Sequence, residues 1–364
     1  MNANSLEQKR SVWIVGAGFS RHAGGPLMPD LFSTMADEML NFWNPTGTDS
    51  NWKSNQRERE AINDTLKSLK RIAEGFRQLS KDENSMKSWE NAEQFLERLD
   101  EYSNTSNFEN FGESRIERIK SKMNLKFDPY EIALVRICKE VNDYLVIMDK
   151  RSERWSPYVH WAQSIRNDVI LSFNYDTLVE RAFNFANREI TVPKPTEDPK
   201  SGSPNLLKLH GSVNWGLDSK GVFIEIDDFS GPVTFPLKHK PIIATPGASK
   251  GRHVSQFPKL WEFAEASVKV ADVVHIVGYR FPETDSSAVL RLINAMRSIK
   301  SGGRINIVLG IDVERDEVKR LEKLINYNVA DNSVEVAALP FFAQDYLTMD
   351  HAWTPKDRGS KFVS

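Results

Sequence analysis

The sequence contains a single cysteine, Cys138, among 364 residues. One cysteine excludes an intrachain disulfide framework and any structural zinc site that requires several cysteines. Cys138 lies in the segment 130–148, whose apolar residues have helical spacing. We therefore expect it to be a buried apolar residue of a helix rather than a reactive thiol.

The chain also lacks an excess of one charge and any long apolar run. Its 48 basic and 50 acidic side chains give a formal net charge of -2, so no overall basic field favours nucleic acid. No window approaches the roughly 18 apolar residues that a membrane helix needs. The first ten residues are polar and lack the apolar core of a secretory signal. We expect a cytoplasmic protein that contacts neither a membrane nor, directly, nucleic acid.

A metal-ligand pattern is missing as well. The acidic residues are scattered along the chain, and no two histidines have the spacing of a ligand pair. We therefore expect no metal. What the chain does have is an ordinary globular composition, with 40% hydrophobic and 27% charged residues. Its length suggests two domains, or one domain with a large insertion.

Short apolar segments alternate with amphipathic ones in the second half of the chain. Predicted strands are 169–172, 206–209, 222–226, 242–244, 273–277 and 305–309, and predicted helices are 176–187, 261–271, 286–298 and 314–325. A further strand precedes residue 16. This alternation predicts an α/β fold, a Rossmann-like parallel sheet with helices on both faces.

The stretch 45–155 has a different character. It is rich in Glu, Lys, Arg and Asn, and its apolar residues recur at helical steps, as in Ile62, Leu66 and Leu69. We interpret it as an inserted all-helical module. The α/β domain would then be discontinuous, 1–44 and 156–330, with 331–364 as a C-terminal tail that could form an interface.

The most informative segment is Gly16-Ala17-Gly18-Phe19-Ser20, at the end of the first apolar run. Glycine permits the tight turn, and the N–H groups of a following helix favour an anion such as a pyrophosphate. The same letters also fit an ordinary strand-to-helix turn, so this segment alone is a weak signal.

Polar residues follow the other predicted strands: Asn174, Asp176, His210, Tyr279 and Asp312. Ligands of parallel α/β sheets bind outside the carboxyl ends of the strands, so we expect these side chains to share one site with the glycine loop. Structural alternatives remain. The first two could cap a helix, the histidine could be a satisfied core residue, and the last two could have no part in a site.

In order and type these segments resemble the sirtuin superfamily. The matching motifs are the GAG-x-S loop, Gly24-Gly25-Pro26, Asn174-Tyr175-Asp176, His210-Gly211 and Val277-Gly278. The resemblance covers about 13–32 and 167–312. Taken together these motifs are fairly specific, whereas any one alone is not.

The sequence departs from the protein deacetylases of that superfamily. They carry four zinc-binding cysteines after the His-Gly pair, but 213–240 contains none and looks like a small β-ribbon. Leu27-Met28-Pro29 replaces the usual Asp-Phe-Arg, and Phe173 stands where glutamine is usual. The chain looks instead like the bacterial sirtuin-like NADases of anti-phage defence. That resemblance implies hydrolysis of NAD⁺ without action on an acyl-lysine.

The residue types suit this chemistry, because cleavage of the nicotinamide–ribose bond passes through an oxocarbenium-like state. Ser20 and the amides of Gly16, Ala17 and Gly18 could anchor phosphates. Asn174 could hold a ribose hydroxyl or a water, and His210, which titrates near neutrality, could act as the base.

The family resemblance implies the remaining roles. Asp176 would hold the nicotinamide carboxamide. Gly278 and Tyr279 would lie near the phosphates and the adenosine ribose, and Asp312 would contact the adenosine end. NAD⁺ would be the substrate, with no metal.

The leading hypothesis is an NAD⁺ glycohydrolase that depletes NAD in anti-phage defence. Such an activity must be restrained, and the resemblance implies assembly, either as a homo-oligomer or with a hexameric HerA-type DNA-translocase ATPase encoded nearby. The helical insertion and Phe341-Phe342 are the surfaces we expect to take part. The alternatives are a zinc-free protein deacylase or ADP-ribosyltransferase, and a non-catalytic scaffold that senses NAD or ADP-ribose.

Overall fold

The computed structural model describes residues 10–27, 152–200, 202–226, 239–244, 257–329 and 333–349, with isolated helical positions between 96 and 145. The predicted helical module, 45–155, therefore lies mostly outside the described residues. At the described positions between 130 and 145 the chain is helical. Cys138 is fully buried there, as expected, and burial raises the pKa of its thiol.

Six parallel strands form the main sheet: β1 (Ser11–Val15), β2 (Val169–Ser172), β3 (Asn205–Lys208), β7 (Val273–Val277), β8 (Arg304–Val308) and β9 (Glu335–Ala338). Their order is β3-β2-β1-β7-β8-β9. Each half therefore winds outward from β1, which is the strand order of a Rossmann fold. The predicted α/β class is confirmed.

Side chains of the central strands alternate between two hydrophobic cores. In β1, Val12 and Ile14 pack into one core, and Trp13 and Val15 pack into the other. Since successive side chains of a strand point to opposite faces, each face of the sheet is covered.

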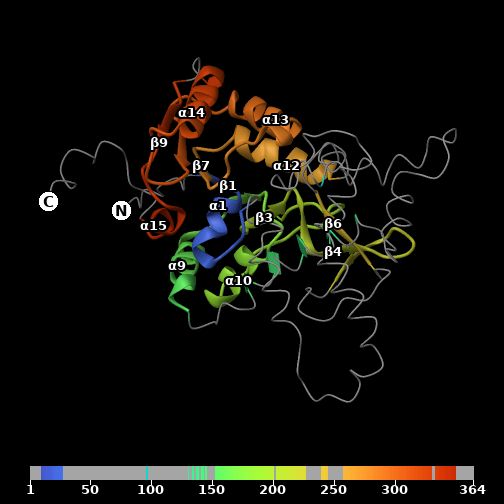
Figure 1. Cartoon of the computed structure of the whole chain (residues 1–364). Helices are drawn as coiled ribbons and strands as arrows, with labels where there is room; N and C mark the ends of the chain where they lie inside the picture. The colour runs from blue at the N-terminus through green and yellow to red at the C-terminus, as the bar shows by residue number, and fades with distance from the viewer. Residues whose placement is uncertain are drawn as a thin grey trace, which may run out of the picture.

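Helices supply both covers. The helices α12 (Pro258–Lys269), α13 (Ser286–Met296) and α14 (Asp316–Val329) cover one face. The helices α9 (Ser156–Ser164), α10 (Leu178–Phe185) and α15 (Ala343–Leu347) cover the other. Figure 1 shows the first group above the sheet and the second group below it.

A small antiparallel sheet branches from the domain after β3. It consists of β4 (Gly211–Leu217), β5 (Phe223–Glu225) and β6 (Lys240–Ile243), with β4 in the centre. This is the ribbon that the sequence predicts at 213–240. Trp215 anchors it to the core, since its ring is buried against Phe223 and Phe257.

The sheet continues beyond the predicted end of the domain at residue 330. β9 pairs in parallel with β8, from Arg304↔Glu335 to Ile307↔Ala338, and α15 follows it. The predicted boundary is therefore too early. The reason is that Glu335-Val336-Ala337-Ala338 contains one β-branched residue and carries little strand signal of its own. Within the described residues, no helix has both the length and the apolar character needed to span a bilayer.

Candidate active site

A pocket of about 650 Å³ lies at the carboxyl ends of the parallel strands. That volume is within the usual range for small-molecule and cofactor sites. All the residues predicted to form the site line it: Gly16, Ala17, Gly18, Ser20, Asn174, Asp176, His210, Gly278, Tyr279 and Asp312. The structure thus brings together residues from five separate segments. Their individual roles toward a ligand stay predictions.

The glycine loop packs directly on the turn after β7. The loop leads into the short helix α1 (Ala17–Ser20). The amide of Gly16 donates to the carbonyl of Val277 at 3.2 Å, and that of Gly18 donates to Gly278 at 3.0 Å. A Cβ atom on Gly16 would lie 2.7 Å from Cα of Tyr279. Close contact between two backbones explains these glycines.

This contact corrects one expectation about the loop. The amides of Gly16 and Gly18, predicted to anchor phosphates, donate instead to carbonyl groups of the protein. Ser20 is buried, and its hydroxyl donates to the carbonyl of Ala17 at 3.2 Å. The loop lines the pocket, but its two glycine amides are used within the fold.

Asn174 ties the end of β2 to the glycine loop. Its side-chain amide donates to the carbonyl of Gly16 at 3.0 Å and lies 3.4 Å from Oγ of Ser20. Asn174 does not cap a helix, because α10 begins four residues later, at Leu178. Its side chain therefore connects two walls of the pocket.

Asp176 lies one residue before Thr177, the N-cap residue of α10, and binds the first amide of that helix. Its Oδ1 accepts a hydrogen bond from the amide of Leu178 at 3.0 Å, at the first turn of α10. Asp176 is buried, and with burial its carboxylate helps to hold the pKa of Tyr144 well above the usual range. Asp176 therefore supports the start of α10 and also lines the pocket.

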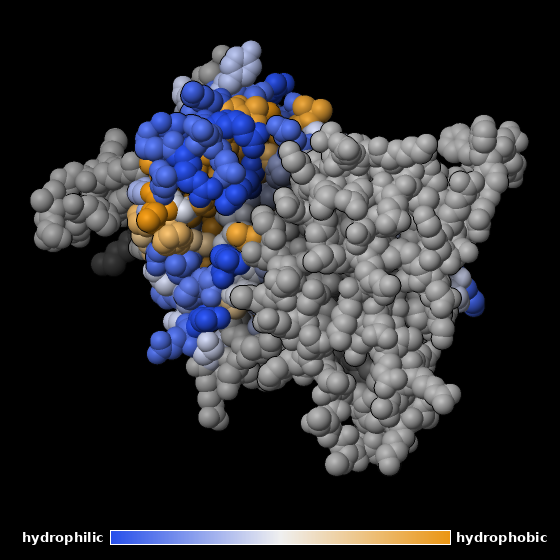
Figure 2. Space-filling model, viewed as in Figure 1, coloured by the Kyte–Doolittle hydropathy of each residue, from blue (hydrophilic) through white to orange (hydrophobic). Residues whose placement is uncertain are grey.

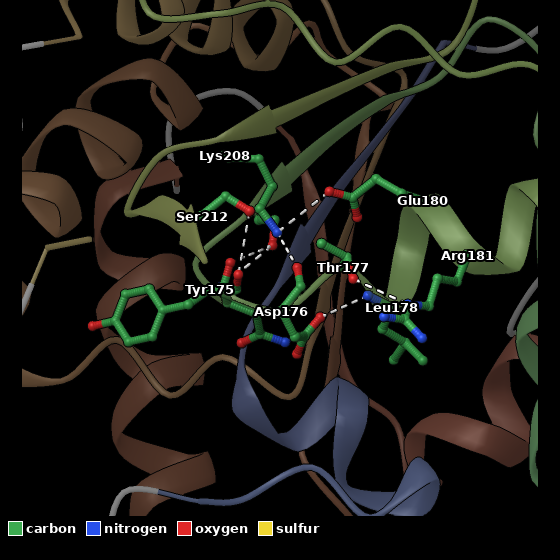
Figure 3. A network of polar contacts seen from close by, with 10 residues as sticks. Tyr175, Asp176, Thr177, Leu178, Glu180, Arg181, Lys208 and Ser212 are labelled. Atoms are coloured by element: carbon green, nitrogen blue, oxygen red, sulfur yellow. Dashed lines mark hydrogen bonds and ion pairs between the residues drawn. The ribbon is translucent and has the colours of Figure 1, made fainter. Parts of the chain in front are cut away.

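A buried lysine supports this segment from β3. Lys208 is 1% exposed; its Nζ donates to the backbone carbonyl of Asp176 and lies 3.8 Å from Oε1 of Glu180. Ser212 adds a hydrogen bond to the carbonyl of Tyr175 at 3.3 Å (Figure 3). Burial raises the pKa of Glu180, although Lys208 opposes the shift. Sequence reasoning missed this pair; a lysine within the apolar run Leu206–Leu209 was the available signal.

His210 is 4% exposed and faces a second buried carboxylate. Its Nε2 lies 3.7 Å from Oδ1 of Asp285, whose Oδ2 accepts a hydrogen bond from the hydroxyl of Tyr279 at 2.8 Å. The ring of Phe173 stacks on Tyr279 at 4.0 Å and meets His210 edge-on at 4.8 Å. His210 thus lies against aromatic rings and the carboxylate of Asp285.

Asp285 lines the pocket but was not among the predicted site residues. The sequence does not indicate a site role for it, because an aspartate directly before a helix is usually an N-cap residue.

No metal site forms within the described ranges, where no cluster of three or more His, Cys, Asp or Glu side chains could bind an ion.

The outer rim of the pocket is charged on one side. Arg280 and Arg315 line it, and both contact Glu317, at 3.2 and 2.7 Å. Asp312 is exposed, and its Oδ1 accepts a hydrogen bond from the amide of Glu314 at 3.0 Å. Guanidinium groups form strong hydrogen bonds to phosphate and carboxylate groups, so these two arginines could bind an anionic ligand.

Another part of the rim is apolar. Ile311 and Phe342 line the pocket and remain 59% and 47% exposed. Figure 2 shows a hydrophilic surface over α14, with hydrophobic residues gathered below it. The pocket therefore opens beside large apolar side chains.

Comparison with known proteins gives one family match, which covers the middle of the chain. A scan against family models matches residues 168–329 to the SIR2-like domain. A search of curated proteins finds no match. Among solved structures, a Sir2 homologue in complex with NAD shares 14% identity, with 94% of this chain and 88% of that chain covered and a TM-score of 0.38.

Sir2Tm bound to a propionylated peptide shares 12% identity, with 94% and 91% of the two chains covered and a TM-score of 0.35. The strand order of the sheet and the family match both indicate a Rossmann-like domain of the SIR2 type. The matched segment contains β2, β3 and β7, whose carboxyl ends supply Asn174, His210 and Tyr279 to the pocket. Residues 168–329 thus match a SIR2-like domain, and this match supports a sirtuin-like family for the chain.

Proposed function

We propose that this protein is an NAD⁺ glycohydrolase that converts NAD⁺ and water to nicotinamide and ADP-ribose. The observation that carries the proposal is the pocket, in which His210, held against Asp285, lies with Asn174 at the strand ends of a SIR2-like domain. NAD⁺ is an anion at its pyrophosphate, which fits the two arginines at the rim.

The chemistry requires one bond to break and one to form. The bond between C1′ of the ribose and the nicotinamide nitrogen breaks, and nicotinamide leaves as a neutral molecule. The oxygen of a water molecule bonds to C1′, and its proton passes to the imidazole of His210 and then to solvent. Asn174 would orient the ribose or the water, since its amide already spans two walls of the pocket.

The small antiparallel sheet lacks cysteine, and this favours hydrolysis over transfer of the ADP-ribosyl group to a protein. The segment between β4 and β6 contains no cysteine, because Cys138 is the single cysteine of the chain. A zinc-stabilised module of the kind found in sirtuin deacetylases therefore has no ligands here. Water is then the simplest acceptor for the ribose carbon.

We further propose that the activity serves bacterial anti-phage defence by depleting NAD and is restrained by assembly. The assembly would be a homo-oligomer or a complex with a hexameric HerA-type ATPase. Phe342 supports this idea, because it is half-exposed and lines the pocket. A partner that covers Phe342 would therefore act on the pocket itself.

The test is nicotinamide release from NAD⁺ by the purified protein, alone and with the product of the neighbouring gene. His210→Ala should lower turnover by about 100-fold or more, which is the usual contribution of a positioned base. Asn174→Ala should lower it by about 100-fold as well, because the ribose or the water would no longer be oriented. His160→Ala is the matched control, since His160 is exposed on α9 and does not line the pocket.

Two other outcomes would redirect the assignment. Release that depends on an added acylated or acceptor protein would indicate a deacylase or a transferase. NAD⁺ binding without release under every condition would indicate a sensor that acts as a scaffold.

A further inference from the structure

Asp285 occupies the capping position of a helix but does not cap it. It ends the 3-10 turn Glu283–Asp285 and is the N-cap residue of α13, yet its side chain makes no capping hydrogen bond. Aspartate at this position normally accepts from the free amides of the first turn. Here the carboxylate turns the other way, toward Tyr279 and His210.

The carboxylate is almost completely buried. The side chains of Asp285 and His210 are 2% and 5% exposed. A buried carboxylate is costly unless it is hydrogen-bonded and paired with a positive charge. Tyr279 supplies one hydrogen bond, and His210 supplies a positive charge whenever its ring is protonated.

We propose that Asp285 is a positioning residue that acts through His210. Its carboxylate holds the Nε2 edge of the ring and stabilises the imidazolium that forms when His210 takes a proton from water. Since a neutral imidazole carries one N–H, the carboxylate favours the proton on Nε2 and leaves Nδ1 as the accepting nitrogen. This role depends on the proposed hydrolysis, but the pairing itself does not.

Other groups near His210 either present aromatic rings or have polar contacts of their own. Phe173 and Tyr175 present rings, with centroids 4.8 and 6.4 Å from the imidazole. The hydroxyl of Tyr279 is directed to Asp285. Lys208, two residues earlier, is engaged with the carbonyl of Asp176 and with Glu180. The 3.7 Å between Nε2 and Oδ1 is long for a hydrogen bond, but catalytic hydrogen bonds that are long in the free enzyme commonly tighten in the substrate or transition-state complex.

The kinetic test uses the isosteric substitution Asp285→Asn. We expect kcat for nicotinamide release to fall by about 100-fold while KM changes by less than about threefold, because the lost interaction acts in the transition state. The acidic limb of the pH–rate profile should move to lower pH, since the neutral amide no longer stabilises the protonated ring. A rise in KM with kcat unchanged would overturn the proposal, because it would mean that Asp285 contacts the substrate directly.

Glu283→Gln is the matched control. Glu283 is an exposed carboxylate on the same 3-10 turn and does not line the pocket. It should leave kcat, KM and the pH profile unchanged. An equal loss in both variants would mean that the turn, and not the Asp285 carboxylate, matters.

A second measurement does not depend on turnover or on the variant folding. In the wild-type protein with ¹⁵N-labelled histidine, the neutral ring of His210 should carry its proton on Nε2; a proton on Nδ1 would overturn the proposal. In Asp285→Asn the titration midpoint of that ring should fall. If pairing is seen but NAD⁺ is never hydrolysed, the proposed function fails. If hydrolysis is seen without pairing, only the role of Asp285 fails.

Discussion

Gly278 shows why the pocket depends on backbone geometry at the scale of single residues. Its φ is +68°, and a Cβ atom there would lie 2.2 Å from the amide nitrogen of Phe19. The sequence predicts that Gly16 and Gly18 bind a phosphate, but in the structure they allow the glycine loop to pack closely against this turn. The glycine motif does mark the pocket, but its glycines are needed for close backbone packing and not for binding a phosphate through their amides.

We expect Gly278→Ala to destabilise the protein by about 2–4 kcal/mol, because it combines a strained φ with a backbone clash. Chemical denaturation measures this loss. Gly302→Ala is the control: its φ is +82°, but a Cβ atom there meets nothing within 4 Å. That variant should lose about 1 kcal/mol from strain alone. Equal losses would show that the contact with the glycine loop is unimportant.

At the scale of elements, an ion pair between the buried Lys208 and the partly buried Glu180 joins β3 to α10. The side chain of Lys208 is 1% exposed and that of Glu180 is 22% exposed. The same lysine donates a hydrogen bond to the carbonyl of Asp176. The pair therefore connects β3 and α10 to the pocket wall. Figure 3 shows this connection.

Removal of the cation alone should leave an uncompensated carboxylate. We expect Lys208→Met to cost about 3 kcal/mol of unfolding free energy at pH 8, and Lys208→Met with Glu180→Leu to recover most of it. Because burial raises the folded pKa of Glu180 above its unfolded value, the folded state binds the proton more readily. Stability from this group is therefore present at low pH and is lost as pH rises. The loss in Lys208→Met should accordingly be smaller at pH 5 than at pH 8.

Denaturant unfolding at the two pH values checks this expectation. Lys259→Met is the surface control, since Lys259 contacts Asp198 at 3.1 Å with side-chain exposures of 47% and 80%. That pair should contribute less than about 1 kcal/mol. A pH-independent loss in Lys208→Met would contradict the buried-charge explanation.

At the scale of the whole molecule, the pocket lies where the two halves of the sheet diverge. Its walls come from the glycine loop, the strand ends of β2, β3, β7 and β8, and the segment that leads into α15. α15 is held under the sheet by Tyr346, whose hydroxyl contacts Nδ1 of His275 at 2.6 Å and accepts from Asn306 at 3.0 Å. The C-terminal elements are thus part of the domain and bring Phe342 to the pocket.

If assembly restrains the activity, the protein should be larger than a monomer at working concentration, alone or with the HerA-type ATPase. Analytical ultracentrifugation measures the mass, and nicotinamide release measures the activity of each species. Phe342→Ser should weaken assembly, whereas Tyr327→Ser, 85% exposed on α14, should not. A monomer whose activity does not respond to the partner would refute this form of regulation.

Much of the sheet could be predicted from the sequence. The strands predicted at 169–172 and 273–277 have the same bounds in the structure. Their prediction succeeds because a short apolar run between turn residues is visible in the local sequence. The polar strand ends were predicted to meet, because parallel strands bring their carboxyl ends to one edge. β9 and α15 were not predicted, because their local signals are weak and only pairing with β8 and packing under the sheet stabilise them.

The sequence by itself determined the fold class and the residues at the edge of the sheet, since both follow from periodicity and chain order. The tertiary structure alone decided which of these residues touch. It placed Asp285 against His210, Lys208 beneath Asp176 and Gly278 against the glycine loop. These contacts join residues far apart in the chain. They depend on how the crossovers pack the helices, which no short window of sequence encodes.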